Sequence, residues 1–239
     1  MRRSPLAAFP SRKIPMDLVT TFFNWPIFVR SLPLLLDGLW RTIALGFLSI
    51  VLGLAGGLLL ALGRMYGPRF LKAVIIAYVD VFRALPVLVW LVIVYYALPF
   101  VGISLSPFAS AAFALTTVSS AYTAEIYRAG IDAIPRGQFE AAQAIGLSAF
   151  DLMRDVVLPQ AIRIVIPPLT NNSINVMKDT ALASVVAMPD LLKQATQAQA
   201  LAANPTPLIG AAFLYLLLLL PLVRLVAIFE KRLGRSGRR

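Results

Sequence analysis

The chain has 239 residues, of which 59% are apolar and only 14% are charged. Soluble domains are usually about 45–50% apolar and about 25% charged, so this composition indicates a membrane protein. The sequence contains no His and no Cys, which excludes histidine acid–base catalysis, Cys–His nucleophiles, Cys/His zinc sites and disulfides. The net charge of +11 indicates the positive-inside bias of membrane proteins rather than nucleic-acid binding, because the basic residues lie between or beside long apolar stretches.

Apolar stretches of about 20 residues predict the membrane spans, because such a helix crosses the hydrocarbon layer. We expect spans at about 38–63, 71–98, 107–127 and 208–229. The first contains a G-x-x-x-G spacing at Gly53 and Gly57, which suits close packing within the chain or, as the minority reading, a dimer face. The last is expected to be kinked at Pro221.

A fifth segment, residues 164–188, is long enough to cross but carries polar and charged side chains. Its polar members include Asn171, Asn172, Asn175, Lys178 and Asp179. A charge at mid-membrane costs about 2.5–3.5 kcal/mol on insertion scales, so hydropathy alone leaves this segment undecided.

Five spans place the two chain ends on opposite sides of the membrane. Segments 64–72, 128–163 and 231–239 then share one side and hold 12 of the 22 Lys and Arg residues, which predicts that this side is the cytoplasm. The N-terminus would face outward although it is basic. One hypothesis is that Met16 is the true start, which would remove four of its five basic residues.

The cytoplasmic segment 128–163 is too long and too patterned for a passive linker. Its Ala- and Gln-rich centre, which begins at Glu140, predicts a short helix, with Gly146 as its left-handed C-terminal cap. The spacing from Ser148 to Asp151 predicts a capping box that opens a second helix, which Pro159 is expected to end. We therefore expect a helix-turn-helix knob that enters a groove on a soluble partner.

The spacing of this loop closely resembles the coupling loop of binding-protein-dependent ABC transporter permeases. The residues that fit are Glu140, Ala141, Ala142, Gly146, Val156, Leu158 and Pro159. The flanking runs at 78–86, 124–138, 158–163 and 171–185 resemble the polar amino-acid branch (histidine, glutamine or arginine type). One departure is the pair Ala84-Leu85, where that branch usually has Gly-Thr.

The resemblance implies an all-α, polytopic membrane protein with the five transmembrane helices of the type I (MetI-like) importer permease fold. It divides the chain into an N-terminal extension and interfacial segment at 1–37, a permease domain at 38–230 and a basic cytoplasmic tail at 231–239, and it favours crossing by 164–188. It further implies a second permease subunit, identical or paralogous, two ATP-hydrolysing subunits that bind ATP and Mg, and a soluble solute-binding protein outside. No cofactor is expected on this chain, which lacks a phosphate-binding G-x-x-x-x-G-K-[ST] run.

The resemblance assigns contact with the ATPase to Glu140, Ala141, Ala142, Gly146, Leu158 and Pro159. Charged and polar groups within the spans are candidates for the solute path, because such groups face a cavity or pair internally. These candidates are Asp80, Arg83, Glu125, Asn175, Lys178 and Asp179.

Several of these path candidates have a competing structural role. Asp80 and Arg83 are spaced to form a salt bridge with each other, and Glu125 lies one turn before Arg128. Lys178 and Asp179 are adjacent, so only one is expected to face a cavity fully. A zwitterionic solute needs a cation for its carboxylate, Arg83 or Lys178, and an anion for its ammonium group, Glu125 or Asp179. Asn171, Asn172, Asn175 and Thr180 could add neutral hydrogen bonds, although packing between helices explains them equally well.

The expected function is the transmembrane subunit of an ATP-driven importer for polar or charged amino acids, or for related solutes such as opines. The alternatives are a membrane-embedded enzyme that uses the span carboxylates, and a passive channel in which the loop is only a cytosolic gate. Copurification of a nucleotide-binding partner that depends on residues 140–146 distinguishes the importer from the channel.

Overall fold

The computed structural model describes residues 18–236, with side chains described for all of these except Val19 and residues 227–236. The hypothesis about Met16 and the basic residues at 1–17 lie outside the described residues. Within the described range every regular element is a helix, which confirms the all-α prediction. Two helical segments are long and apolar enough to cross a membrane, Thr20–Tyr66 and Thr206–Val226, and the bent pair Arg69–Ala84 and Val87–Val101 adds a third if it counts as one span.

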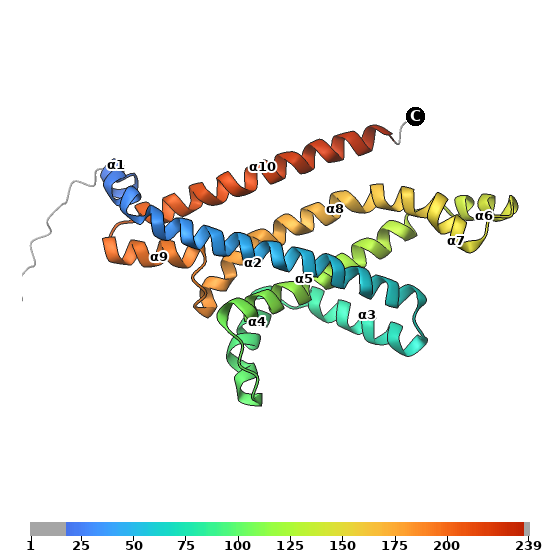
Figure 1. Cartoon of the computed structure of the whole chain (residues 1–239), viewed down its shortest axis with the longest axis horizontal. Coiled ribbons are helices and arrows are strands. Elements are labelled where there is room, and N and C mark those ends of the chain that lie inside the picture. Colours follow the sequence, from blue (N-terminus) through green and yellow to red (C-terminus); the bar gives the residue numbers. More distant parts are fainter. Residues whose placement is uncertain (1–17, 237–239) are drawn as a thin grey trace, which may run out of the picture.

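Four long helices, α2, α5, α8 and α10, run along the long axis of the molecule, with α6 and α7 at one end and α1 and α9 at the other (Figure 1). The helices, in chain order, are α1 (Leu18–Phe22), α2 (Trp25–Tyr66), α3 (Arg69–Ala84), α4 (Val87–Val92), the π-helical η1 (Ile93–Ala97), the 3₁₀ η2 (Leu98–Val101), α5 (Pro107–Asp132), α6 (Arg136–Ala144), α7 (Ala149–Asp151), the π-helical η3 (Leu152–Val157), α8 (Leu158–Asp179), the 3₁₀ η4 (Thr180–Val186), α9 (Leu191–Ala202) and α10 (Thr206–Ser236).

Helix α2 begins well before the expected span. The predicted start near Gly38 is replaced by Trp25, where the side chain of Asn24 accepts a hydrogen bond from the Ile27 amide at 3.2 Å and so caps the helix. Residues 25–37 were expected to belong to an interfacial segment, but they form the first turns of the same helix. The start of this helix is joined to the start of α10, where the Asn24 amide donates to Thr206 Oγ1 at 3.1 Å.

Helices α2 and α5 approach closely through small residues. A Cβ added at Gly57 would lie 2.5 Å from Thr123 Cβ, and one added at Gly53 would overlap the side chain of Ser119. The G-x-x-x-G spacing therefore packs within the chain, the favoured of its two readings. The short side chains let the two backbones meet where hydrophobic burial contributes little to helix association.

The predicted span 71–98 is not one continuous helix, because the chain bends by 104° between α3 and α4. Pro86 lacks the amide that an unbroken helix would need, and it holds Leu85 in an extended conformation, with φ −82° and ψ 127°. The bend is held against α5, where the Trp90 indole donates to Thr117 Oγ1 at 2.8 Å and packs 5.1 Å from the Phe82 ring across the bend. As a result α4 points away from the bundle axis (Figure 1).

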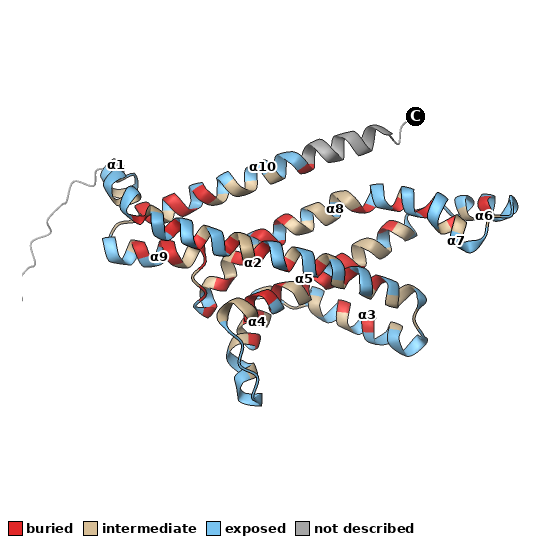
Figure 2. Ribbon diagram, in the orientation of Figure 1, coloured by how far each residue is buried: buried red, intermediate tan, exposed pale blue. Residues whose placement is uncertain are grey.

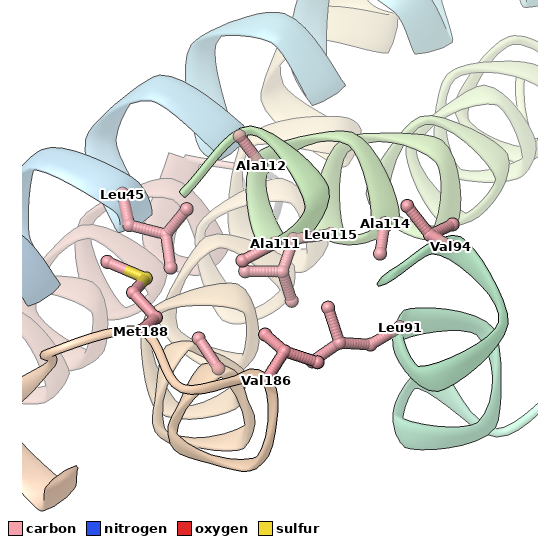
Figure 3. Close-up of a cluster of buried hydrophobic side chains, with 10 residues drawn as sticks. Leu45, Leu91, Val94, Ala111, Ala112, Ala114, Leu115, Val186 and Met188 are labelled. Carbon is pink, nitrogen blue, oxygen red and sulfur yellow. The ribbon is translucent and has the colours of Figure 1, made fainter. Parts of the chain in front are cut away.

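The main apolar core lies where α2, α4, α5 and the segment after α8 meet. Figure 3 shows Leu45, Leu91, Leu115, Val186 and Met188 converging there. Figure 2 shows the buried residues concentrated on the inner faces of α2, α5 and α8, whereas α6 and the end of α3 are largely exposed.

Candidate functional site

The loop between α5 and α8 forms the expected knob at one end of the molecule (Figure 1). Helix α6 ends at Ala144, and Gly146 follows with φ +79°, the left-handed conformation that favours glycine. Ser148 then caps the next helix, because its Oγ accepts a hydrogen bond from the Asp151 amide at 3.2 Å. The predicted turn and the predicted cap are both present.

The residues of the predicted coupling motif differ in exposure. Glu140 and Ala141 are exposed, whereas Ala142 is buried in a small core with Leu152 and Val157. In this conformation Ala142 is therefore covered by the chain itself, and its small side chain lets α6 pack against the next helix. The exposed apolar residues of the knob are Ile145 and Phe150, which are 78% and 71% exposed.

Pro159 does not end the second helix, contrary to the prediction. The helix continues from α7 through η3 into α8, and Leu158 and Pro159 lie exposed in the first turn of α8. Residues 152–157 are π-helical, and this wider turn accommodates a proline ring that would clash with the carbonyl four residues earlier in a regular α-helix. The knob is thus continuous with the long helix α8.

A cavity of about 310 Å³ lies between α5 and the C-terminal half of α8. Its lining residues are Val87, Leu115, Val118, Ser119, Tyr122, Asn172, Asn175, Val176, Lys178 and Asp179. Leu115 also belongs to the main core, so one wall of the cavity is continuous with that core. The volume is at the lower end of the range for small-molecule sites, about 300–1,000 Å³.

Lys178 and Asp179 both belong to the lining of this cavity, although Lys178 is exposed and Asp179 only half-buried. They are the last two residues of α8, which passes into the 3₁₀ segment η4 at Thr180. Asn175, one turn earlier, also lines the cavity, while Asn172 donates weakly to Ser119 Oγ and Thr123 Oγ1 at 3.4 Å each. The cavity therefore presents a cation, an anion and neutral amides together.

Arg83 lies over Tyr122, a residue of the cavity lining, and does not pair with Asp80. Its guanidinium carbon lies 5.7 Å from the centroid of the Tyr122 ring, a cation–π arrangement. The predicted salt bridge from Arg83 to Asp80 is absent among the described residues, and Asp80 is exposed and does not line the cavity. Arg83 lies in the last turn of α3, and its side chain contacts α5 at Tyr122.

Glu125 lies beyond the cavity, toward the knob. Its carboxylate accepts hydrogen bonds from Arg64 Nη1 at 3.0 Å and from Arg128 Nε at 3.2 Å, and Arg128 also contacts Asp132. The predicted pair of Glu125 with Arg128 is therefore present. Glu125 is not among the cavity residues, and its oxygens are already engaged.

Sequence reasoning missed Tyr122, Ser119 and Arg64. Tyr122 lies about one turn before Glu125, and Ser119 lies about two turns before it. Helical spacing along α5 could therefore have identified both residues. Arg64 gave no such signal, because its partner is 61 residues away in the sequence. Among residues 18–236, no group of three or more Asp and Glu side chains is arranged to hold a metal ion.

A family model described as "Binding-protein-dependent transport system inner membrane component" matches residues 53–235, most of the chain. The chain belongs to this permease family. It is 39% identical over 224 residues to the L-cystine transport system permease protein TcyB of Bacillus subtilis (strain 168), which covers 93% of this chain and 92% of the relative. It is also 36% identical to the arginine transport system permease protein ArtQ of the same organism, over 86% of this chain and 94% of that protein.

Solved structures agree with this assignment. The crystal structure of an amino acid ABC transporter with histidines matches with a TM-score of 0.81 and 38% identity, over 85% of this chain and 96% of that chain. An inward-facing structure of the MetNI methionine ABC transporter matches with a TM-score of 0.62 and 29% identity, over 87% and 98%.

The permease is thus the membrane subunit of an ABC importer for amino acids. It is an inner membrane component, and it works with a separate ATPase and a solute-binding protein. It does not itself hydrolyse ATP.

Proposed function

We propose that the permease binds polar or charged amino acids, or related solutes such as opines, in the cavity between α5 and α8. The observation that carries this proposal is the presence of Lys178 and Asp179 in one cavity. Lys178 is suited to bind the solute carboxylate and Asp179 its ammonium group, while Asn175 adds a neutral donor and acceptor. Arg83 lies at the Tyr122 wall as a second cation. The names of relatives that transport cystine, glutamine and arginine support this class of solute.

The chain crosses the membrane five times in this proposal. The crossings are α2, the bent pair α3–α4, α5, α8 with η4, and α10. Helices α5 and α8 have 26 and 22 residues, about 39 and 33 Å, enough to cross a hydrocarbon core of about 30 Å. The N-terminus faces outward, and the knob and the basic C-terminal end face the cytoplasm, since most of the basic residues belong to that side.

The knob docks on the ATPase. Ile145 and Phe150 expose apolar surface on either side of the Gly146 turn, and Glu140 is an exposed anion in α6 of the same knob. The complex contains two ATPase subunits, which hold ATP and Mg, and a second permease subunit that is identical or paralogous. Leu158 and Pro159 connect this docking surface to α8, the helix that carries Lys178 and Asp179 at its other end.

Transport then follows from rigid helices rather than from covalent chemistry. ATP binding closes the ATPase subunits, the two knobs approach each other, and the spans change the cavity from inward-facing to outward-facing. The binding protein delivers the solute, and ATP hydrolysis restores the inward-facing state.

The test is to reconstitute the whole transporter in proteoliposomes and to measure ATPase stimulation by its binding protein, loaded in turn with each of a panel of amino acids. We expect stimulation and uptake with polar or charged amino acids and none with leucine or valine. Equal stimulation by apolar amino acids would contradict the proposed solute class. Uptake in the absence of ATP would contradict the proposed mechanism.

A further inference from the structure

Glu125 joins the ends of α2 and α5 that lie nearer the knob. One carboxylate oxygen accepts hydrogen bonds from Arg64 of α2 and from Arg128 of α5, and the other contacts Arg128 again. The three side chains are only 21–31% exposed, so water screens these ion pairs less than it screens pairs on an open surface. Glu125, Arg64 and Arg128 therefore form a hydrogen-bonded ion-pair group that joins α2 to α5.

The link lies beyond the close glycine packing of the same two helices. Arg64 follows Gly57 by about two helical turns. The next glycine of α2, Gly63, packs against α3 instead, because a Cβ there would lie 2.8 Å from Ile75 Cδ1. Glu125 thus holds α5 to α2 at a level where the glycines no longer do so.

The two linked helices lead in different directions along the chain. Helix α5 continues through Asp132 into α6 of the knob, whereas α2 turns at Gly67 into α3. Helix α3 ends at the bend beside Tyr122 and the cavity. Arg64 therefore lies on the helix that leads through α3 to the cavity. Arg128 lies on the helix that leads into the knob.

We infer that Glu125 is a positioning residue for energy coupling, which makes the cytoplasmic ends of α2 and α5 move as one body, so that displacement of the knob reaches α3 and the cavity wall. This inference rests on the proposed docking of the knob on the ATPase. It gives Glu125 a role other than solute binding, in agreement with its place outside the cavity. A carboxylate shared by two arginines suits this role, because losing it leaves two like charges facing each other.

The test uses the complete transporter in proteoliposomes and measures solute imported per ATP hydrolysed. We expect Glu125→Gln and Arg64→Gln to lower this ratio about three- to tenfold, the scale on which residues within a coupling network act. Arg64→Lys keeps a cation opposite Glu125 and should retain most of the ratio. Asp132→Asn is the matched control, because it removes a contact of Arg128 but leaves the link between α2 and α5 intact.

A second readout separates positioning from simple stability. The chain has no native cysteine, so spin labels at Tyr66→Cys and Ala133→Cys report the distance between the ends of α2 and α5. We expect one narrow distance distribution with and without trapped nucleotide in the otherwise unchanged protein, and a broad one after Glu125→Gln. Normal solute-to-ATP ratios in Glu125→Gln, or lower yield of complex with a normal ratio, would overturn the inference. If Gly146→Val also leaves coupling normal, the docking role of the knob fails instead.

Discussion

The hydroxyl of Tyr122 donates a hydrogen bond to the main-chain carbonyl of Arg83 at 3.2 Å, while the Arg83 guanidinium lies over the same tyrosine ring. An unbroken α-helix would satisfy carbonyls at this position from within, but the bend at Pro86 interrupts α3. Tyr122 thus caps a broken helix and orients a cation beside the cavity. Through these two contacts, Tyr122 holds both the bend after α3 and the Arg83 cation beside the proposed solute site.

Replacing Tyr122 separates these two contacts. Tyr122→Phe removes the hydrogen bond, which is worth about 1 kcal/mol, and retains the ring, so we expect a several-fold rise in the solute concentration for half-maximal uptake. Tyr122→Ala also removes the ring that Arg83 contacts, and it should raise this half-maximal solute concentration further. Uptake kinetics in proteoliposomes provide the measurement. Identical kinetics for Tyr122→Ala and the unchanged protein would contradict a role for this wall.

The charges at the end of α8 should decide solute binding. Lys178→Gln and Asp179→Asn each remove one charged hydrogen-bond partner, worth about 1.5–3 kcal/mol, so we expect affinity for the solute to fall about tenfold or more. Equilibrium binding of labelled solute to the purified complex provides the measurement. Lys193→Gln, in α9 and outside the cavity, is the control and should leave affinity unchanged. Equal losses in the control would refute the assignment.

The Gly146 turn should be sensitive to any side chain. A residue with a Cβ in this left-handed conformation costs about 1–2 kcal/mol, and a branched side chain is worse. We expect Gly146→Val to change the angle between α6 and α7. Solute-loaded binding protein should then no longer stimulate ATP hydrolysis, whereas the permease should still insert into the membrane. Gly137→Ala in the same loop has open space around its Cβ and should behave normally. Intact stimulation in Gly146→Val would remove the assigned role.

The proposed topology can be tested with single cysteines, because the chain has none of its own. Ser104→Cys lies in the turn between η2 and α5, and Gln138→Cys lies in α6 of the knob; both positions are exposed. We expect a membrane-impermeant maleimide to label residue 104 from outside intact cells, and residue 138 only in inverted vesicles. Labelling of both from the same side would contradict the five-span arrangement.

Asp190 should make stability depend on pH. Burial raises the pKa of its carboxyl group to about 6, although Oδ1 accepts a hydrogen bond from the Lys193 amide at 2.9 Å. Because folding favours the protonated form, the stability it contributes is present below the ordinary pKa of about 3.8 and is lost as pH rises through about 6.

The corresponding measurement is the unfolding midpoint of the purified permease between pH 5 and pH 8. The unchanged protein should become less stable across this range. Asp190→Asn can still accept the Lys193 hydrogen bond, and it should be more stable at pH 8 by up to about 3 kcal/mol, with a flatter pH profile. Parallel profiles for the two proteins would show that Asp190 does not titrate in this range.

Local sequence signals predicted local structure well. The conformation of Gly146, the cap at Ser148 and the pair of Glu125 with Arg128 all depend on residues within one or two turns of each other, so spacing alone identifies them. Proline was harder to interpret. Pro86 bends the chain where a continuous span was expected, whereas Pro159 lies inside a helix that was expected to stop. The outcome depends on what surrounds each proline: α5 holds the bent α4, and a π-helical turn accommodates Pro159.

The sequence by itself determined the membrane environment, the all-α class and the family. Composition can be counted without a structure, and span length and the motif of the knob are properties of short stretches of chain. Only the tertiary structure decided which charged residues meet. Arg83 turns to Tyr122 and away from Asp80, Arg64 reaches Glu125 from another helix, and Lys178 and Asp179 share one cavity. Arg83 and Arg64 meet partners on other helices, and Lys178 and Asp179 are adjacent residues at the end of α8. Their arrangement follows from how α2, α3, α5 and α8 pack, which no local pattern encodes.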